Sequence, residues 1–348
     1  MRLDLLNRLP LICPHCRQRG IDARLRCSEV CVEENGFVIE GLLECSNTDC
    51  AVGHYPILAG VPIIVRDPVA WWQNARPSLT QVNCNSLKIK DFFSLLDAAA
   101  PDRQHHSSRL GTWMELHYGH NGSTSAPLAL PTAEDYWQTL NALTAEQHLH
   151  GPALELGCAV GRYTFDLARR APLAIGVDCN FELVAAAAQI QRQQVVHYRR
   201  RRRGTHFEIV DFSHTVPQNV LFMLADALDP PFQAEQFALV AALNLLDNVS
   251  APLILLGQMD ALLRQDGLMI LGSPYEWRAE NCEPAQWLEN ATLDASTTLR
   301  QLLTEQLIPE LSLDYRILQE IHDLPWVLRQ HDRYWSLYSV HLLSARKD

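Results

Sequence analysis

Short apolar runs alternate with amphipathic segments over the second half of the chain. Five runs have the length and apolar character of buried strands, and we expect strands at 153–156, 173–177, 221–225, 237–243 and 268–273. Apolar residues at helical spacing lie between them and predict helices at 164–170, 181–194 and 252–264. Strands that alternate with helices predict an α/β fold, in which both faces of a parallel sheet are covered.

The flanking regions have different patterns. The first region ends in HYPILAGVPIIV, where turn residues alternate with β-branched residues as in a hairpin. Between 90 and 148 we expect helices broken by the polar loop GHNGSTSAPLALP. Near the end, TTLRQLLTEQLIPEL predicts a helix and YWSLYSVHLLSAR predicts a strand. We therefore expect a small domain at 1–68, a connector at 69–112 and a larger domain at 113–348.

Cysteines change the picture of the first region. Six of the ten cysteines lie within the first 50 residues, and with no secretion signal this clustering favours metal binding over disulfides. The pairs CPHC and CSNTDC bracket an apparent hairpin, and four thiolates so placed suit a structural zinc ion. The predicted ligands are Cys13, Cys16, Cys45 and Cys50. Whether His54, Cys27 or Cys31 takes part stays open, although the last two, on a helix or loop, also suit plain burial.

The net charge restricts the partners. It is −11, from 40 acidic and 29 basic residues, which argues against general affinity for nucleic acid. We expect the five arginines at 199–203 to form a solvated loop. No apolar run approaches the roughly 20 residues of a membrane-spanning helix, so we expect no membrane partner and a cytoplasmic location. The sequence predicts no particular oligomeric state.

The segment LELGCAVGR joins the first of these strands to its helix through a turn with two glycines, Gly157 and Gly161. Glycine permits positive φ and a close approach to a ligand, which the N–H groups of the helix start then face. The E-x-G-x-x-x-G form lacks the close glycine pair of a dinucleotide site. It resembles motif I of class I S-adenosylmethionine-dependent methyltransferases. This resemblance implies a Rossmann-like fold with a mostly parallel seven-stranded sheet.

Three polar residues extend the resemblance along the chain. Asp178 ends the second strand, where this family accepts the ribose hydroxyls, and Asp226 ends the third, where it accepts the adenine amino group. Asn244 lies in the fourth motif, which faces the substrate. The implied cofactor is S-adenosylmethionine. The implied binding residues are Glu155, Gly157, Cys158, Gly161, Asp178, Asp226, Ala227 and Asn244.

Two further resemblances cover most of the chain. Residues 8–66, with LICPHC, ECSNTDC and HYPILAGVPIIV, resemble the small zinc proteins that activate translation-factor and tRNA methyltransferases. In that family the zinc is structural and the domain stabilises its methyltransferase by packing. Residues 113–341, with ELHYG, SPYEWRAENCEPAQWLEN and DLPWVLRQHDRYWSLYSVH, resemble the C-terminal module of ovothiol synthases, which methylates an imidazole nitrogen of mercaptohistidine. Two departures, WLEN without a glycine turn and WSLYSVH in place of WSVAHAT, leave the acceptor open.

The second resemblance implies a small-molecule substrate, either mercaptohistidine or a related histidine derivative. Methyl transfer to an imidazole depends mainly on positioning its nitrogen, and a base is optional. The catalytic candidates are His117, Tyr118, Tyr275 and His331. Further candidates to line the site are Trp277, Arg329, Tyr334 and Trp335, with an arginine able to hold a carboxylate through a bidentate pair. For each of these residues the alternative is a packed side chain or a surface ion pair.

The competing function is base methylation of rRNA or tRNA, with the cysteine module holding RNA. The arginine run supports it. Three features oppose it: the acidic balance, the lack of aromatic residues within the run, and a fourth motif, LNLLDN, without the proline-bracketed aromatic that holds a flipped base. A non-enzymatic scaffold is disfavoured because all the cofactor acids are intact.

Overall fold

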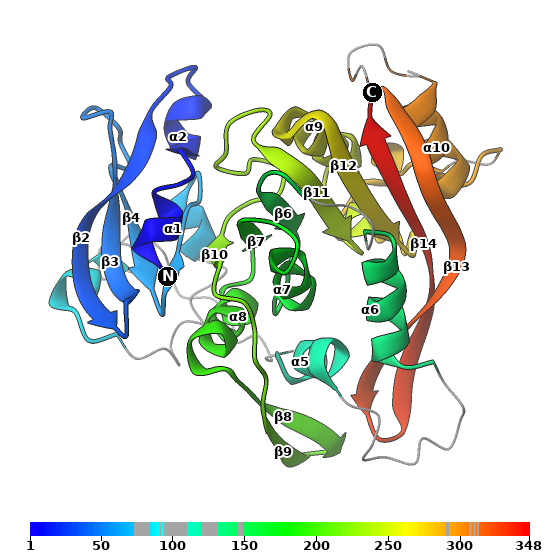
Figure 1. Ribbon diagram of the computed structural model, residues 1–348, viewed down its shortest axis with the longest axis horizontal. Helices are drawn as coiled ribbons and strands as arrows, with labels where there is room; N and C mark the ends of the chain where they lie inside the picture. The colour runs from blue at the N-terminus through cyan, green and yellow to red at the C-terminus, as the bar shows by residue number, and fades with distance from the viewer. Residues whose placement is uncertain are drawn as a thin grey trace.

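The computed structural model describes residues 1–72, 84–90, 92–93, 110–119, 131–144, 149–289, 292–305, 308, 311 and 313–348. These residues build two β-sheets and a two-stranded ribbon (Figure 1). The predicted connector at 69–112 and the predicted polar loop before residue 131 lie largely outside the described residues. No helix in the described part of the chain has the length and apolar character that crossing a membrane requires.

The first sheet is antiparallel, and its strands follow one another in chain order. Its strands are β1 (Leu11–Ile12), β2 (Arg24–Glu34), β3 (Phe37–Cys45), β4 (His54–Leu58) and β5 (Val61–Pro62). Short helices α1 (Leu3–Leu6) and α2 (Pro14–Arg17) flank β1. Asn35 and Gly36, with φ of 50° and 79°, make the tight turn from β2 to β3, as two-residue hairpin loops require. The β-rich first region is therefore confirmed, as is the hairpin predicted in HYPILAGVPIIV.

The second sheet has seven strands in the order β10-β7-β6-β11-β12-β14-β13. Its strands are β6 (Ala153–Leu156), β7 (Ala174–Asp178), β10 (Val220–Leu224), β11 (Phe237–Leu243), β12 (Leu263–Ser273), β13 (Tyr315–His331) and β14 (Tyr334–Lys347). All run parallel except β14, which lies antiparallel between β12 and β13. The predicted mostly parallel seven-stranded sheet is confirmed.

Helices cover both faces of this sheet. They are α5 (Leu110–Tyr118), α6 (Ala133–Ala142), α7 (Arg162–Ala168), α8 (Phe181–Gln193), α9 (Pro252–Leu262) and α10 (Ala295–Thr304), with single 3-10 turns at Leu246–Asn248 and Pro284–Gln286. Alternate residues of β11 show the two layers. Leu239 and Ala241 pack into a core with α5 to α8, whereas Val240 and Ala242 pack into a core with α9 and α10. Burial on both faces explains why β11 is a continuous apolar run.

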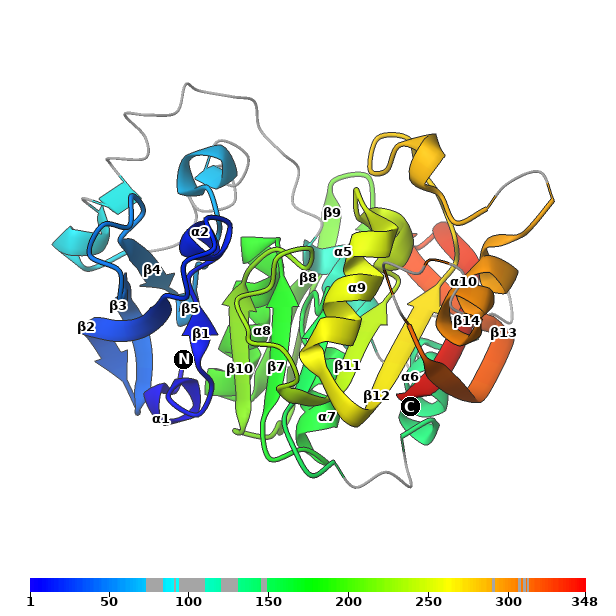
Figure 2. The same ribbon diagram turned by 90° about the horizontal axis from the view of Figure 1, so that it is seen from above.

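The first region packs against the edge strand β10 of the large sheet (Figures 1 and 2). Ile63 forms a parallel bridge with Leu224, and the N–H of Ile64 donates to the Leu224 carbonyl at 2.8 Å. The N–H of Ile12 donates to the carbonyl of Pro231 at 2.9 Å. Because an exposed edge strand is a site of unwanted pairing, this packing protects β10.

The arginine run is not the solvated loop that we expected. Residues Val195–Arg203 form strand β8, which pairs with β9 (His206–Ser213) as a two-stranded ribbon. Alternation along β8 buries the Arg200 side chain and exposes Arg199 and Arg201. In Figure 1 the ribbon projects from the lower end of the molecule, and the tip of the β13–β14 hairpin lies beside it.

Candidate active site

The glycine turn between β6 and α7 takes a conformation that its sequence favours. Gly157, Ala159 and Gly161 all have positive φ, at 75°, 46° and 80°. A Cβ atom at Gly161 would lie only 2.6 Å from the ring of Phe222, so this position requires glycine. The turn is fixed to the neighbouring strand, because the N–H groups of residues 157 and 158 both donate to the carbonyl of residue 177.

Glu155 lies beneath the turn and not on its surface. Its side chain is buried and accepts a hydrogen bond from the hydroxyl of Thr164. Burial raises the pKa of Glu155 to about 8, against a usual value near 4.5. Cys158 is also fully buried. Both residues therefore shape the turn from inside the protein.

Asp178 and Asp226 lie at the carboxyl ends of adjacent parallel strands, since Asp178 is paired with Leu224. Asp178 accepts from the N–H of Ala159 with one carboxylate oxygen and from that of Asn180 with the other, both at 2.9 Å. Each oxygen keeps a second lone pair, which is the acceptor set that a ribose diol requires. Asp226 is exposed, and it accepts from the N–H of Leu228 at 2.8 Å. Ala227, beside it, is half-buried.

Asn244 follows β11 with a φ of 52°, in the left-handed region that few non-glycine residues adopt. Its side-chain N–H donates to the hydroxyl of Tyr136 at 3.4 Å. Its side-chain oxygen is buried and has no hydrogen-bond partner among the described residues. A buried acceptor left unpaired costs roughly 1–3 kcal/mol, so a donor on a bound molecule would stabilise it.

His117 and Tyr118 end helix α5 beneath the cofactor turn. The Tyr118 hydroxyl donates to the carbonyl of Val160 at 2.8 Å. His117 is buried beside the ring of Trp137, 5.0 Å away between centroids. Burial, with a smaller contribution from Arg162, lowers the pKa of His117 to about 3, so its imidazole is uncharged at neutral pH.

Tyr275 and His331 lie far apart. Tyr275 lies two residues after the end of β12 with a φ of 53°, and its hydroxyl is 2.6 Å from Nδ1 of His341. His331 ends β13 at the hairpin tip, where its Nδ1 accepts from the N–H of Arg333 at 3.2 Å. Ten residues of strand separate His331 from Ile321, which is roughly 30 Å along the hairpin. The four catalytic candidates therefore do not form one cluster.

Arg329 belongs to an ion-pair network, which was the alternative to a substrate-binding role for this residue. Glu115 of α5 accepts from Arg329 at 3.0 Å and from Arg200 at 2.7 Å, and also from the hydroxyl of Tyr198. Asp332 pairs with Arg329 and, at 2.8 Å, with Arg202. These bonds join α5, the β8–β9 ribbon and the hairpin tip. Of the other side chains expected near the site, Trp277 and Trp335 are half-buried and Tyr334 is exposed.

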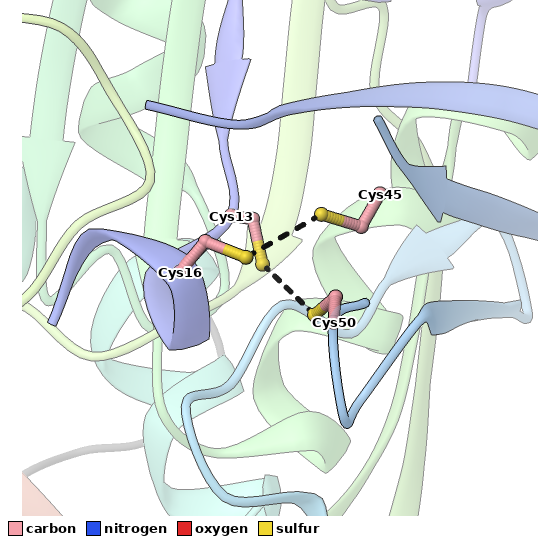
Figure 3. A group of neighbouring side chains, drawn as sticks. All are labelled: Cys13, Cys16, Cys45 and Cys50. Atoms are coloured by element: carbon pink, nitrogen blue, oxygen red, sulfur yellow. Dashed lines mark hydrogen bonds between the residues drawn. The ribbon is translucent and has the colours of Figure 1, made fainter. Parts of the chain in front are cut away.

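The four predicted metal ligands meet in one place (Figure 3). The Sγ atoms of Cys13 and Cys50 are 3.8 Å apart, those of Cys16 and Cys45 are 3.7 Å apart, and all four lie within 4.8 Å of one another. A tetrahedron with metal–sulfur bonds of about 2.3 Å has edges of about 3.8 Å, so the arrangement fits a tetrahedral ion.

Two N–H groups support the thiols of this cluster. The side chain of Asn47 donates to Cys16 Sγ, and the backbone of Gly53 donates to Cys50 Sγ, both at 3.4 Å. The three residues left open in the sequence lie outside the cluster. The His54 side chain is 50% exposed beside Glu44, while Cys27 and Cys31 lie on strand β2, not on a helix or loop as expected.

The comparisons with known proteins come from one family and from solved structures. Residues 154–271 match the family described as "Methyltransferase domain". No curated protein sequence matches the chain. The structure of YcgJ from Bacillus subtilis is similar at 15% identity and a TM-score of 0.39, covering 62% of this chain and 98% of that one.

Two other solved structures are similar at the same level. Phosphoethanolamine N-methyltransferase 2 from Haemonchus contortus, in complex with S-adenosyl-L-methionine, has 14% identity and a TM-score of 0.38, covering 59% of this chain and 42% of that one. The [4+2]-cyclase SpnF has 16% identity and a TM-score of 0.40, covering 75% and 94%. The family match covers the predicted cofactor motifs: residues 154–271 form a methyltransferase domain, and the chain is an S-adenosylmethionine-dependent methyltransferase.

Proposed function

We propose that the protein methylates an imidazole nitrogen of a mercaptohistidine-type small molecule or a related histidine derivative. S-adenosylmethionine supplies the methyl group as an electrophilic sulfonium. Asp178 and Asp226 are the proposed acceptors for its ribose and adenine, and the turn at 157–161 is the proposed seat of its amino acid part. The role of this chain is to orient the acceptor nitrogen in line with the methyl group. Most of the rate acceleration arises from this orientation.

The observation that carries the proposal is the unpaired side-chain oxygen of Asn244. It is buried at the carboxyl end of β11, the edge where open α/β sheets bind ligands, and it accepts no bond within the described structure. The ammonium group of a histidine derivative is a donor of suitable size. Tyr136 and Trp326, whose ring centroids are 6.3 Å apart, are buried aromatic side chains on the side of Asn244 to which its amide donates.

Binding of mercaptohistidine in the presence of S-adenosylhomocysteine tests this proposal by calorimetry. We expect measurable heat for the wild type and affinity at least tenfold lower for Asn244→Leu, which keeps the branched shape of the side chain and removes the acceptor. Asn7→Leu, at an exposed amide in the first region, is the matched control and retains the affinity. Absence of binding to a folded wild type that binds S-adenosylhomocysteine would overturn the substrate assignment.

We also propose a structural zinc ion held by the thiolates of Cys13, Cys16, Cys45 and Cys50. The sulfur spacing supports it, as do the two N–H donors to the sulfurs. The ion would fix α2 to the β3–β4 connection within the domain at 1–68. Because this domain packs on β10, the zinc would also support the strand that ends two residues before Asp226.

RNA base methylation stays as the second candidate because of one observation on the ribbon. The antiparallel register pairs Arg201 with Phe207 and Arg199 with Ile209 on the exposed face, and the Arg199 guanidinium lies 4.5 Å from the centre of the Phe207 ring. Aromatic and basic side chains are thus interleaved in space, although not in sequence. On the inner face, Arg200 and Arg202 are engaged with carboxylates. Turnover of tRNA or rRNA tests this alternative.

A further inference from the structure

A chain of hydrogen bonds links three titratable side chains next to the end of β12. The hydroxyl of Tyr275 lies 2.6 Å from Nδ1 of His341, and Nε2 of His341 lies 3.0 Å from Oε1 of Glu320. His341 is 4% exposed and sits on β14 directly opposite Ser273, the last residue of β12. Neither His341 nor Glu320 had been singled out from the sequence.

The partners of His341 fix its tautomer. A carboxylate only accepts hydrogen bonds, so Nε2, which faces Glu320, carries the proton. Nδ1 is then the bare nitrogen and accepts from the Tyr275 hydroxyl. The imidazole is therefore set to receive a proton from Tyr275, while Glu320 is placed to stabilise the imidazolium that would form.

The backbone around Tyr275 is strained and braced at the substrate edge of the sheet. Tyr275 and Asn244 have φ of 53° and 52° and follow the adjacent strands β12 and β11. Asp247 holds this edge together, accepting from the Ser273 hydroxyl at 3.2 Å and from the N–H of Glu276 at 2.8 Å. Left-handed non-glycine residues persist where surrounding structure enforces them, which is typical of functional sites.

The same region contains three side chains of metal-binding type, Glu320, His322 and His341, within 4.8 Å of one another. The hydrogen bonds argue against a metal ion there. Both ring nitrogens of His341 are already bonded, and the second oxygen of Glu320 is held by Arg300. The arrangement is complete as a proton path.

We propose that Tyr275 takes the proton from the methyl acceptor, with His341 and Glu320 acting through it as positioning residues. This inference rests on the proposed function and narrows the substrate: the acceptor ring carries a hydrogen that it loses on methylation, as an imidazole does from the N–H beside its bare nitrogen. Tertiary amines and thioethers have no proton to lose, so the proposal excludes them as methyl acceptors.

With S-adenosylmethionine bound, the lone pair of the bare ring nitrogen of the acceptor would form the bond to the methyl carbon, while the carbon–sulfur bond breaks and its electron pair stays on sulfur. The proton on the other ring nitrogen would pass to Oη of Tyr275 as the Tyr275 proton passes to Nδ1 of His341. The products are the N-methyl compound, S-adenosylhomocysteine and the imidazolium form of His341, which then loses its proton to water.

Charged groups from two elements face His341. Glu320 and His322 come from β13, while Asp294 and Arg300 come from the start and the body of α10. Burial lowers the pKa of His341, and His322 lowers it further, whereas Glu320 and Asp294 raise it. His341 is thus neutral, and able to accept a proton, at physiological pH.

Nitrogen NMR of the histidine-labelled full chain tests the relay without any substrate. The His341 signals are assigned by their loss in His341→Asn. We expect a protonated Nε2 and a bare Nδ1 at pH 7, with the Nδ1 signal shifted in Tyr275→Phe. A proton on Nδ1, or a doubly protonated ring at pH 7, would overturn the proposal.

Kinetics with mercaptohistidine provide the second arm. Tyr275→Phe and His341→Asn are expected to lower kcat about 100-fold with KM unchanged, because proton transfer contributes on this order. Glu320→Gln should move the acid limb of the pH profile to lower pH, since Glu320 raises the pKa of His341. Tyr315→Phe is the matched control, because Tyr315 donates to Asp260 at 2.8 Å near the opposite end of the strands. Equal kcat for Tyr275→Phe and Tyr315→Phe would contradict the relay.

The two arms separate the failure of the relay from the failure of the proposed function. If the wild type does not methylate mercaptohistidine but shows the expected His341 tautomer, only the proposed substrate is rejected. If the wild type methylates mercaptohistidine and the Tyr275→Phe variant keeps full kcat, only the proposed relay is rejected.

Discussion

The Tyr118 hydroxyl donates a 2.8 Å hydrogen bond to the carbonyl of Val160, and helix α5 thereby holds the glycine turn in place. Val160 directly precedes Gly161, where the turn passes into α7. A residue that we had considered for catalysis therefore supports the turn that is the proposed seat of the cofactor. The bond is buried, so its loss leaves a carbonyl of the turn without its partner.

Tyr118→Phe should weaken S-adenosylmethionine binding by about fivefold, which corresponds to roughly 1 kcal/mol for one buried hydrogen bond. Calorimetric titration with the cofactor measures this directly. Tyr315→Phe, which removes a comparable bond elsewhere, should leave the affinity unchanged. Equal affinities for the wild type and Tyr118→Phe would show that α5 does not shape the cofactor site.

Gly161→Ala should destabilise the fold by more than about 2 kcal/mol, because the new Cβ would meet the Phe222 ring at 2.6 Å and φ is 80°. Gly36→Ala is a matched control, since its φ is 79° and nothing lies within 4 Å of the added Cβ. That variant carries only the backbone strain, on the order of 1 kcal/mol. Urea unfolding measures the loss in the free energy of unfolding for both variants. Equal losses would mean that the contact with Phe222 relaxes without cost.

Glu155 should make the stability of the cofactor-free protein depend on pH. Its pKa in the folded state, about 8, lies above the unfolded value, so ionisation disfavours the fold. The penalty is absent below about pH 4.5, grows as pH rises, and reaches roughly 3 kcal/mol at pH 7. Glu155→Gln should remove this slope between pH 5 and 8 in urea unfolding. Parallel stability profiles for variant and wild type would contradict the raised pKa.

The four-cysteine cluster should hold about one zinc ion per chain, measured by plasma emission on purified protein. Cys16→Ser should lose the metal and lower the unfolding midpoint by at least about 5 °C, because a structural zinc contributes directly to folding. The Cys27→Ser variant, changed on β2 outside the cluster, should keep both the metal and the unfolding midpoint. Metal-free wild-type protein with an unchanged midpoint would refute the zinc assignment.

The sequence predicted elements well wherever burial alone decides structure. Strands β6 and β11 have the predicted bounds, 153–156 and 237–243, because both faces of each are buried and their apolar runs are continuous. The four thiols were found for a similar reason, since pairs of cysteines at short spacing carry their own signal. Residue 178 also lies at a strand end, as expected.

Long-range pairing explains what could not be predicted. We expected a solvated loop in place of strand β8 because five consecutive arginines do not indicate burial. The partner of the buried Arg200 is Glu115, 85 residues earlier in the chain. The candidates Tyr275 and His331 separate for a related reason. Nothing local tells that β13 runs for 17 residues and carries His331 to a distant hairpin tip. The Tyr275–His341 contact, 66 residues apart, is equally invisible in the sequence.

The most direct test of the account is the rate of S-adenosylhomocysteine formation by the purified protein, with mercaptohistidine and with total tRNA and rRNA in parallel. We predict that mercaptohistidine is turned over at least tenfold faster than either RNA, and that the product carries the methyl group on an imidazole nitrogen. Equal or faster turnover of RNA would contradict the account and move the substrate to the exposed arginine face of the β8–β9 ribbon.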